Sequence, residues 1–487
     1  MTILILLSIL PLASAVTALL RERRLVEMVY LASAAGAFAA AVWLAAGVLQ
    51  TGPISLAGGF LYADALSALV LLLTAFVYMV TAPYAVGYFR CDGADSGSAP
   101  RMYYWLTPLF GFSMFFVAVA NNLGVMWVAV EGTTLASIFL VTFYGRPTSL
   151  EAAWKYAILG GVGLSMALFG TVLTYYSAHQ ALGAESLTAL NWNVLVAGAG
   201  KFDKTVMRLA FILVLLGYGT KAGLAPMHTW KPDAYSEAPV PVAVLMATAT
   251  LNCALYALAR FYVLTANCLG PGFASRLLVL FGLLTIGIAV PFILVQRSYR
   301  RLLAYSSIDH GGIMALSLGF GGLLGPLGML LHMTFHSVTK PLLFFCAGNA
   351  QQHTGSDSLK KSTGGLCHDL PISGPVFLLA ALAVTGMPPF SMFLSEFTVL
   401  RAGFAAQSTL ASGLFLAFVA AIFCGFFYHV AQLVWGPPNG EPRGDSSPWS
   451  TYPVIGLAAV VVLMGFWLPA PVYKLVEQAA RILVVRP

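Results

Sequence analysis

The feature of this sequence that most restricts its fold is a series of long apolar runs with almost no charged residues inside them. Only 9% of the 487 residues are charged and 59% are hydrophobic, whereas about 25% of the residues in an average soluble domain are charged. So few charges cannot cover a surface exposed to water. The net charge of +7 comes from basic residues scattered over loops, not from a patch that could bind nucleic acid. The composition therefore excludes a soluble globule, a disordered chain and a nucleic-acid-binding protein, and it predicts a chain embedded in a lipid bilayer.

The apolar runs, read between polar or Pro/Gly-rich breaks, predict about fourteen membrane spans of about 20 residues each. The runs are too long and too uniformly apolar for the alternating pattern of a membrane barrel. We therefore expect an all-α, polytopic membrane protein. The expected bounds of the spans are 2–20, 25–50, 62–89, 103–120, 122–144, 151–176, 205–228, 238–265, 274–296, 301–321, 323–349, 373–400, 406–435 and 452–470.

The distribution of Lys and Arg predicts the orientation of these spans. The loops after odd-numbered spans carry more basic residues than the loops on the opposite side, and Lys231 and Arg300 are counted among them. Because basic loops stay in the cytoplasm, we expect both termini to lie outside the cytoplasm, across a bacterial or archaeal inner membrane. The tail from Val472 to Arg486 is amphipathic at helical spacing, which fits either a helix lying on the membrane surface or a docking contact for a partner.

Charged side chains inside the predicted spans are the strongest indication of function, because a charge at the bilayer centre costs a few kcal/mol unless it faces a protein interior. Glu131 lies well inside the fifth predicted span, and Lys221 lies in the seventh. An acid at this depth indicates a proton path, although a protonated or salt-bridged packing residue is the alternative. Lys221 lies beside a break in its span, which favours a hydrated pocket over a lysine that reaches to the membrane surface.

Two predicted spans contain proline breaks. Pro226 interrupts the seventh span, and Pro388 and Pro389 interrupt the twelfth. Broken helices at membrane depth are tolerated where they line a cavity or are buried in protein. The breaks lie five spans apart, which predicts an inverted five-helix repeat. The resulting division is 1–102 for helices 1–3, 103–265 for the first repeat, 274–435 for the second, and 452–487 for the last helix and tail.

Three polar residues recur at i, i+4 and i+8 in LHMTFHSVTKPLL, and we call His332, His336 and Lys340 the histidine stripe. This spacing places them on one helix face. An HxxxH pair can bind zinc, but no Glu or third ligand stands in the metalloprotease arrangement, and packing histidines are a further alternative. We favour a proton relay, because His titrates near physiological pH.

Three further candidates have less support. Glu396 follows the second break, where it is either part of the same polar axis or a carboxylate facing water at a helix end. His310 in AYSSIDHGGIM is a possible relay residue. Lys155 lies near the start of its span and could instead reach to the membrane surface.

The chain offers no sign of a cofactor of its own. Its six cysteines show no CxxC or other short ligand spacing, so neither a zinc site nor a cysteine-bound iron–sulfur cluster is indicated. No Gly-rich loop stands in a nucleotide-binding context. If the chain serves a redox enzyme, the redox centres are expected in partner subunits.

Four long stretches carry a resemblance to a known family: GTKAGLAPMHTWKPDAYSEAP, AYSSIDHGGIM, LHMTFHSVTKPLLFFCAGN and GMPPFSMFLSEF. They resemble the antiporter-like membrane subunits, a family that includes proton-pumping subunits of respiratory complex I, multisubunit sodium/proton antiporters and the group 4 nickel–iron hydrogenases. The resemblance extends from about Asp64 to Glu396. Within the family, EAAWKYAILGGVGLSMALFGTVL and LNCALYALARFY look most like component F of hydrogenase-4, the formate hydrogenlyase type.

The resemblance implies about fourteen helices with inverted five-helix repeats and a role for each candidate. Glu131 and Lys221 would form the coupling ion pair of a first half-channel, the histidine stripe would form the central hydrophilic axis, and Glu396 would act in the second half-channel. One position departs from the pattern. Complex I subunits usually carry a lysine in the eighth span, in a motif like LKMGTYGFLRF, where this chain has Asn252. A neutral amide cannot take up and release protons, so water or His332 would have to bridge the gap, or the channel is incomplete.

The sequence thus predicts a proton- or cation-translocating subunit of a redox-driven complex, most similar to a membrane-bound hydrogenase or formate hydrogenlyase. Expected partners are other antiporter-like subunits, a membrane anchor subunit, and hydrophilic redox subunits that hold a nickel–iron centre and iron–sulfur clusters. Two alternatives remain open: a cation/proton antiporter subunit without a redox partner, and a non-pumping membrane anchor, which Asn252 favours. Inorganic-carbon uptake systems also use such subunits.

Overall fold

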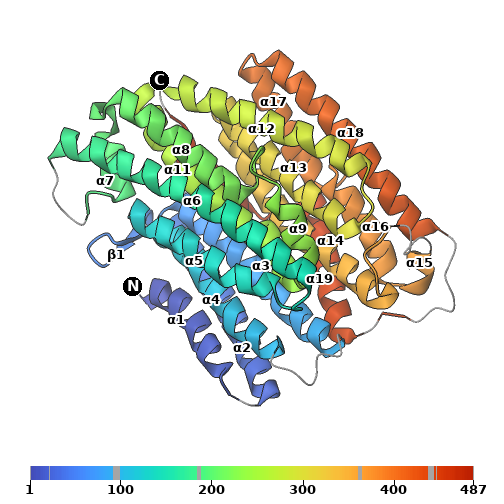
Figure 1. Ribbon diagram of the computed structural model, residues 1–487. Coiled ribbons are helices and arrows are strands. Elements are labelled where there is room, and N and C mark those ends of the chain that lie inside the picture. The colour runs from blue at the N-terminus through green and yellow to red at the C-terminus, as the bar shows by residue number, and fades with distance from the viewer. Residues whose placement is uncertain are drawn as a thin grey trace.

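The structure is a computed structural model that describes residues 2–20, 22–91, 99–183, 188–359, 365–436, 444–445 and 447–485. Within these ranges the chain is a bundle of tilted, mostly parallel and antiparallel helices (Figure 1). A short antiparallel hairpin, β1 (Ile54–Leu56) and β2 (Leu61–Ala63), connects the second and third long helices. The predicted all-α membrane fold is confirmed.

The helices, in chain order, are α1 (Thr2–Thr17), α2 (Arg23–Thr51), α3 (Ala65–Cys91), α4 (Ala99–Val119), α5 (Leu123–Val141), α6 (Pro147–Leu182), α7 (Trp192–Gly198), α8 (Lys204–Ala222), α9 (Trp230–Glu237), α10 (Val240–Leu245), α11 (Leu251–Leu269), α12 (Pro271–Leu294), α13 (Tyr299–Phe320), α14 (Leu324–Thr354), α15 (Leu366–Asp369), α16 (Ser373–Val384), α17 (Ser391–Ala405), α18 (Thr409–Trp435), α19 (Pro448–Phe466) and α20 (Ala470–Leu483). A 3₁₀ turn, Ala199–Lys201, follows α7, and a π-helical turn, Met246–Thr250, joins α10 to α11.

Ten helices of the described chain are long and apolar enough to cross a membrane. The other predicted spans correspond to α1, which has 16 residues, to α13 and α14, which carry more polar side chains, and to the divided pair α16 and α17. The division of the chain into two inverted repeats stays a prediction.

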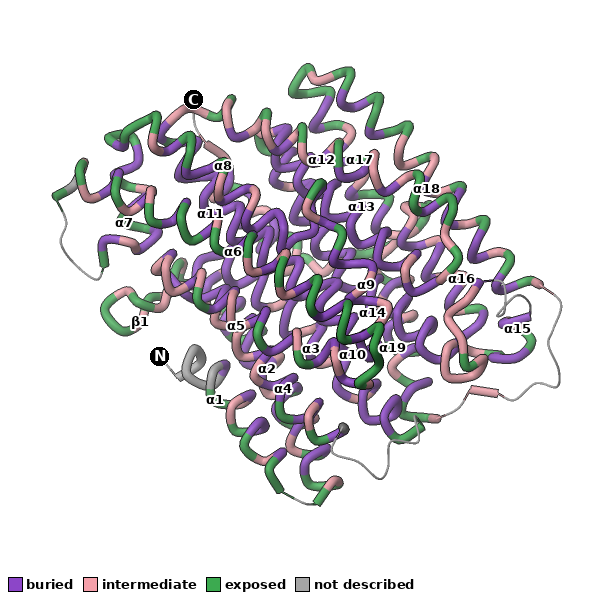
Figure 2. Tube along the Cα trace, in the orientation of Figure 1, coloured by how far each residue is buried: buried purple, intermediate pink, exposed green. Residues whose placement is uncertain are grey.

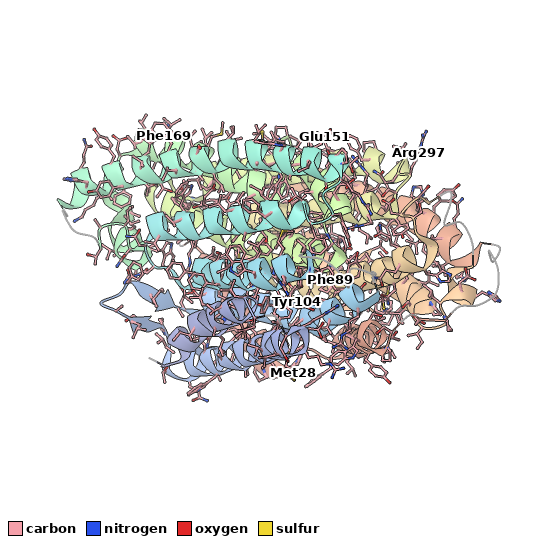
Figure 3. All side chains as sticks on the ribbon, turned by 60° about the horizontal axis from the view of Figure 1, so that its bottom comes forward. Met28, Phe89, Tyr104, Glu151, Phe169 and Arg297 are labelled. Atoms are coloured by element: carbon pink, nitrogen blue, oxygen red, sulfur yellow. The ribbon has the colours of Figure 1, made fainter. Side chains whose placement is uncertain are left out.

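The centre of the bundle is formed by α11, α13 and α14, which are buried on nearly every side (Figure 2). A helix that is buried all round belongs to the core of a large protein. The outer helices instead expose large apolar side chains, as Figure 3 shows for Phe169 on α6. Polar side chains on the central helices are therefore shielded from both water and lipid.

The two predicted helix breaks are present. The first lies between the end of α8 at Ala222 and the start of α9 at Trp230, and it contains Pro226. The second lies between α16 and α17, and it contains Pro388 and Pro389. The π-helical turn in the predicted eighth span was not expected from the sequence. Such turns are rare and are frequent at functional sites.

The structure corrects the residue count behind the predicted orientation. Lys231 and Arg300 were counted as loop residues, but Lys231 is 0% exposed and Arg300 is 2% exposed. They are buried because α9 folds back into the bundle, and the Arg300 guanidinium donates to the carbonyls of Tyr235 and Ala238. Five other residues in the count lie outside the described residues: Arg21, Lys360, Lys361, Arg443 and Arg486. The expected position of both termini outside the cytoplasm stays a prediction.

The amphipathic tail forms α20, and this helix packs against α3 and α14 of the same chain. Its apolar face is buried, including Leu475, Val476 and Leu483. The apolar face of the tail is thus covered within this chain.

Close contact between α6 and α8 depends on glycine. A Cβ atom added at Gly217 would lie 2.6 Å from the Gly163 carbonyl oxygen and 2.5 Å from the Ala167 Cβ. We expect Gly217→Ala to lower the free energy of unfolding by about 1–3 kcal/mol, the usual cost of overpacking. The measurement is unfolding of the purified protein in mixed micelles titrated with a denaturing detergent. Gly161→Ala on α6 is the matched control, because nothing lies within 4 Å of its added Cβ and alanine has the higher helix propensity. Equal stability of the two variants would contradict the prediction.

Candidate functional site

A line of polar side chains runs through the buried centre of the bundle. It is contributed by α5, α8, α9, α11, α13, α14 and α17. Its most deeply buried members are Lys221, Lys231, Asn252, Asp309, His310, His332, His336 and Lys340, each at most 3% exposed. Because polar groups at this depth are expensive, their concentration in one region indicates a shared role.

Lys221 lies at the last turn of α8, immediately before the first helix break. Its ammonium Nζ donates to Thr134 Oγ1 on α5 at 2.8 Å and to the Tyr156 hydroxyl on α6 at 2.5 Å. The Tyr156 hydroxyl in turn contacts Ser137 Oγ at 2.8 Å. Hydroxyl groups, which can both donate and accept, thus surround the lysine.

Glu131 lies one helical turn before Thr134 on α5 and is half-buried. Its Oε2 atom is buried and has no hydrogen-bond partner within the described residues. Glu131 and Lys221 interact electrostatically, but the contacts of the lysine are with hydroxyls. The structure therefore brings the two predicted residues to the same end of the line, with Thr134 hydrogen-bonded to the lysine. The expected direct ion pair stays a prediction.

Lys231 is a buried member of the line that the sequence analysis missed. It lies in the first turn of α9, where its Nζ donates to the carbonyl oxygen of Ala222 at the end of α8. Its ammonium also lies 5.8 Å from the centre of the Tyr235 ring. The sequence does contain a sign of this burial. Lys231 follows Lys221 by ten residues and the helix-breaking Pro226 by five, and a chain that folds back after the break would return the lysine to the interior.

Asn252 lies in the first turn of α11, directly after the π-helical turn. Its Nδ2 donates to Ser337 Oγ on α14 at 2.8 Å, and its Oδ1 is buried with no hydrogen-bond partner in the described chain. Ser337 follows His336 in sequence. The structure thus places the amide beside the histidine stripe.

The histidine stripe joins α13 and α17 through a directed hydrogen-bond chain. His310 Nδ1 lies 3.0 Å from His332 Nε2, and His332 Nδ1 lies 3.0 Å from Ser395 Oγ. Ser395 Oγ donates to the Met392 carbonyl oxygen at 2.7 Å, so it accepts from His332. A neutral imidazole has one donor and one acceptor nitrogen, so His310 donates to His332. Such a chain can pass a proton by exchanging its donors and acceptors.

His336 lies beside this chain, with its ring centre 5.0 Å from that of His310. Both of its ring nitrogens are buried without a hydrogen-bond partner in the part of the chain that the structure describes. Lys340, the last residue of the stripe, donates from Nζ to Ser306 Oγ on α13 at 2.8 Å. The spacing predicted only a shared face of one helix, and in the structure this face of α14 lies along α13.

The far end of the line contains two acids. Asp309 on α13 interacts electrostatically with Lys340 and with Glu396, and its Oδ1 is buried without a hydrogen-bond partner in the described residues. The Glu396 carboxylate lies against Gly386 at the second helix break, where an added Cβ would come within 2.1 Å of Oε2. Asp309 was not singled out from the sequence, although it precedes His310 within a quoted motif.

Two basic residues that the sequence placed inside spans lie away from this line. Lys155 is 47% exposed and pairs with Glu151 at 2.7 Å and Asp233 at 3.1 Å, and its relay role stays a prediction. These residues line a polar cavity of about 170 Å³. Arg260 pairs with Asp64 at 2.7 Å.

Over the described ranges, no group of three or more His, Cys, Asp or Glu residues is placed to hold a metal ion. His310 contacts both stripe histidines, and His332 also contacts the Ser395 hydroxyl.

A polytopic helical bundle with buried ionisable side chains between two broken helices is the arrangement of an ion-translocating membrane protein. The comparisons with known proteins agree. Residues 120–423 match the family described as "NADH:quinone oxidoreductase/Mrp antiporter, TM". The chain belongs to this family and is an antiporter-like, proton-translocating subunit of the type found in multisubunit membrane complexes.

Individual relatives cover nearly the whole chain. The chain is 37% identical over 431 residues, 88% of its own length and 89% of the relative's, to a hydrogenase-4 component F homolog from Methylacidiphilum infernorum. It is 29% identical to subunit N of an NADH-quinone oxidoreductase from Dehalococcoides mccartyi, over 87% of this chain and 86% of the relative.

Solved structures show the same fold. A chain of an archaeal membrane-bound sulfane sulfur reductase superposes with a TM-score of 0.88 at 25% identity, over 99% of this chain and 98% of that one. A chain of respiratory complex I from Thermus thermophilus superposes with a TM-score of 0.76 at 25% identity, over 95% of this chain and 96% of that one.

Proposed function

We propose that this chain translocates protons within a redox-driven membrane complex of the hydrogenase type. The observation that carries the proposal is the line of buried polar side chains across the bundle interior, from Lys221 at one helix break to Glu396 at the other. Sequence similarity to a hydrogenase-4 component F homolog supports the choice of complex. The expected partners are other antiporter-like subunits, an anchor subunit, and hydrophilic subunits that hold nickel–iron and iron–sulfur centres.

The mechanism begins at the Glu131 end. When the Glu131 carboxylate is close, its negative charge stabilises a proton on Lys221. A movement of a few Å in a low-dielectric site changes the interaction of such a pair by kcal/mol amounts. Separation of the two groups would therefore release the lysine proton toward the histidine stripe. From there, the hydrogen bonds between His310 and His332 and between His332 and Ser395 lead to α17, which also carries Glu396.

The redox reaction itself takes place elsewhere in the complex. The chain's own side chains bind, hold and pass the proton, and partner subunits supply the driving force. A change in charge or conformation in a neighbouring membrane subunit would alter the distance between Glu131 and Lys221.

Purification of the tagged native chain in mild detergent tests the choice of complex. We expect a hydrogenase-like large subunit, nickel and iron to copurify, as measured by mass spectrometry and metal analysis. Copurification of small antiporter subunits alone, without nickel or iron, would contradict the proposal and favour a cation/proton exchanger. A sodium-dependent collapse of an imposed pH gradient without an electron donor would confirm that alternative.

A further inference from the structure

Lys231 lies between the two halves of the line, and the mechanism above does not use it. It is 0% exposed on a helix that folds back into the bundle and packs against α6 and α13. It interacts electrostatically with Lys221 toward one end and with His336 and Lys340 toward the other. Its Nζ contacts the last residue of α8, the helix of Lys221, and α9 packs against α13, the helix of His310, so the residue lies between the first half of the line and the histidine stripe.

The surroundings of Lys231 are unusual for a structural lysine. The only hydrogen bond of its side chain within the described residues is to the Ala222 carbonyl, and none of the ion pairs there includes it. A buried charge without a counter-ion costs several kcal/mol, so packing alone does not explain a lysine here. An ammonium group that can lose its proton avoids this cost when neutral.

The fold keeps space for this side chain at the first helix break. Gly223 has a φ of +76°, and an added Cβ would lie 2.4 Å from Lys231 Cδ and Cε and 2.8 Å from Nζ. Both the backbone conformation and the space therefore require glycine. The break thus holds two lysines, Lys221 at its start and Lys231 folded back over its glycine.

We propose that Lys231 is the residue that carries protons between Lys221 and the histidine stripe, a role that the neutral Asn252 cannot fill. The inference rests on the proposed proton translocation. In the transfer, an N–H bond of the Lys221 ammonium breaks and an N–H bond forms at the neutral amine of Lys231. Lys231 then donates the proton to a ring nitrogen of His336, both of which lack partners in the described residues. Only the proton moves, and no group is oxidised or reduced.

Three substitutions of Lys231 test this role, each in membrane vesicles that contain the assembled complex. An imposed potassium diffusion potential drives proton entry, and an entrapped pH dye reports the flux. We expect Lys231→Gln and Lys231→Arg to reduce the flux at least about tenfold, because glutamine carries no proton and arginine does not release one. Lys231→His should retain flux, with its pH profile moved toward lower pH, because imidazole titrates near pH 6.5 and a lysine amine near 10.4.

This pattern separates proton transfer from packing and from charge. A flux within twofold of wild type in Lys231→Gln would overturn the proposal, and so would full rescue by Lys231→Arg. Lys204→Met, at the exposed start of α8, is the control. If Lys221→Met abolishes the flux while the Lys231 variants keep it, this inference fails and the proposed function stands. If neither position affects the flux, the proposed function fails.

Gly223→Ala gives a second test that keeps the lysine but displaces it, with added backbone strain at a φ of +76°. We expect a loss of flux in the assembled complex, because the added methyl group occupies the site of the Lys231 side chain. Gly219→Ala, in the last turn of α8, is the control, since its added Cβ would lie 3.5 Å from Leu224 Cδ1, an ordinary contact. Wild-type flux in an assembled Gly223→Ala protein would overturn the inference.

Discussion

Replacement of Lys221 by methionine is expected to abolish proton flux through the chain while the complex stays assembled. Lys221 is 1% exposed and donates to hydroxyls from two other helices, so it joins α8 to α5 and α6 by hydrogen bonds. Methionine fills a similar volume and cannot carry a proton. We expect the potential-driven flux to fall about a hundredfold, the low end of what a positioned proton-transfer group contributes.

Glu131→Gln provides the companion measurement. If the Glu131 carboxylate only stabilises the proton on Lys221, the glutamine variant should lose more of the coupling between the redox reaction and proton transport than of the passive proton flux. Donor-driven proton uptake should therefore fall further than potential-driven flux. Assembly is checked for each variant by native gel, with the exposed Lys204→Met as the control. Undiminished flux in an assembled Lys221→Met protein, or unchanged donor-driven uptake in Glu131→Gln, would contradict the proposed roles.

The parts of the site that could be predicted from sequence are those set by local geometry. The histidine stripe follows from helical spacing, and the two helix breaks follow from Pro226 and the Pro388–Pro389 pair. Each depends on residues within a few turns, where backbone sterics and helix periodicity decide the outcome. The membrane environment could also be predicted, because it follows from the composition of the whole chain.

The parts that could not be predicted depend on contacts between distant segments. Lys231 was assigned to a loop because its burial arises only when α9 folds back against α6 and α13. The hydrogen bond from His310 to His332 joins residues 22 positions apart in neighbouring helices. Arg260 lies inside the eighth predicted span, but its partner Asp64 lies 196 residues away. No pattern within one span contains this information.

The pair formed by Asp64 and Arg260 is expected to make the largest contribution to stability of any ion pair in the described chain. Both side chains are at most 3% exposed, and the two guanidinium nitrogens of Arg260 donate to the two carboxylate oxygens at 2.7 Å each. The guanidinium also lies 4.1 Å from the centre of the Trp192 ring. The pair therefore ties the start of α3, just after the hairpin, to α11 and to α7.

Removal of one partner leaves the other charge buried without compensation. We expect Arg260→Leu or Asp64→Asn to lower the free energy of unfolding by about 3–5 kcal/mol, measured by denaturing-detergent titration in mixed micelles. The double variant should lose less than the sum of the two, because neither charge is then left alone. Arg481→Ala, which breaks the exposed pair with Glu477, should change stability by less than about 1 kcal/mol. Additive losses in the double variant would show that the pair itself contributes nothing.

The pH dependence of stability gives an independent reading of the same pair. Burial alone would raise the pKa of the Asp64 carboxyl, but the Arg260 guanidinium and the backbone N–H groups of Ser67 and Leu66 outweigh it and hold this pKa below its usual range. Because the pKa is lower in the folded state than in the unfolded state, the pair stabilises the protein fully above the unfolded pKa and loses this contribution as the pH falls through the folded one. Wild type should therefore lose stability on acidification below the ordinary carboxyl range. The Asp64→Asn variant should lack that part of the loss, since it has no carboxyl at this position to protonate, and equal acid sensitivity of the two proteins would contradict the assignment.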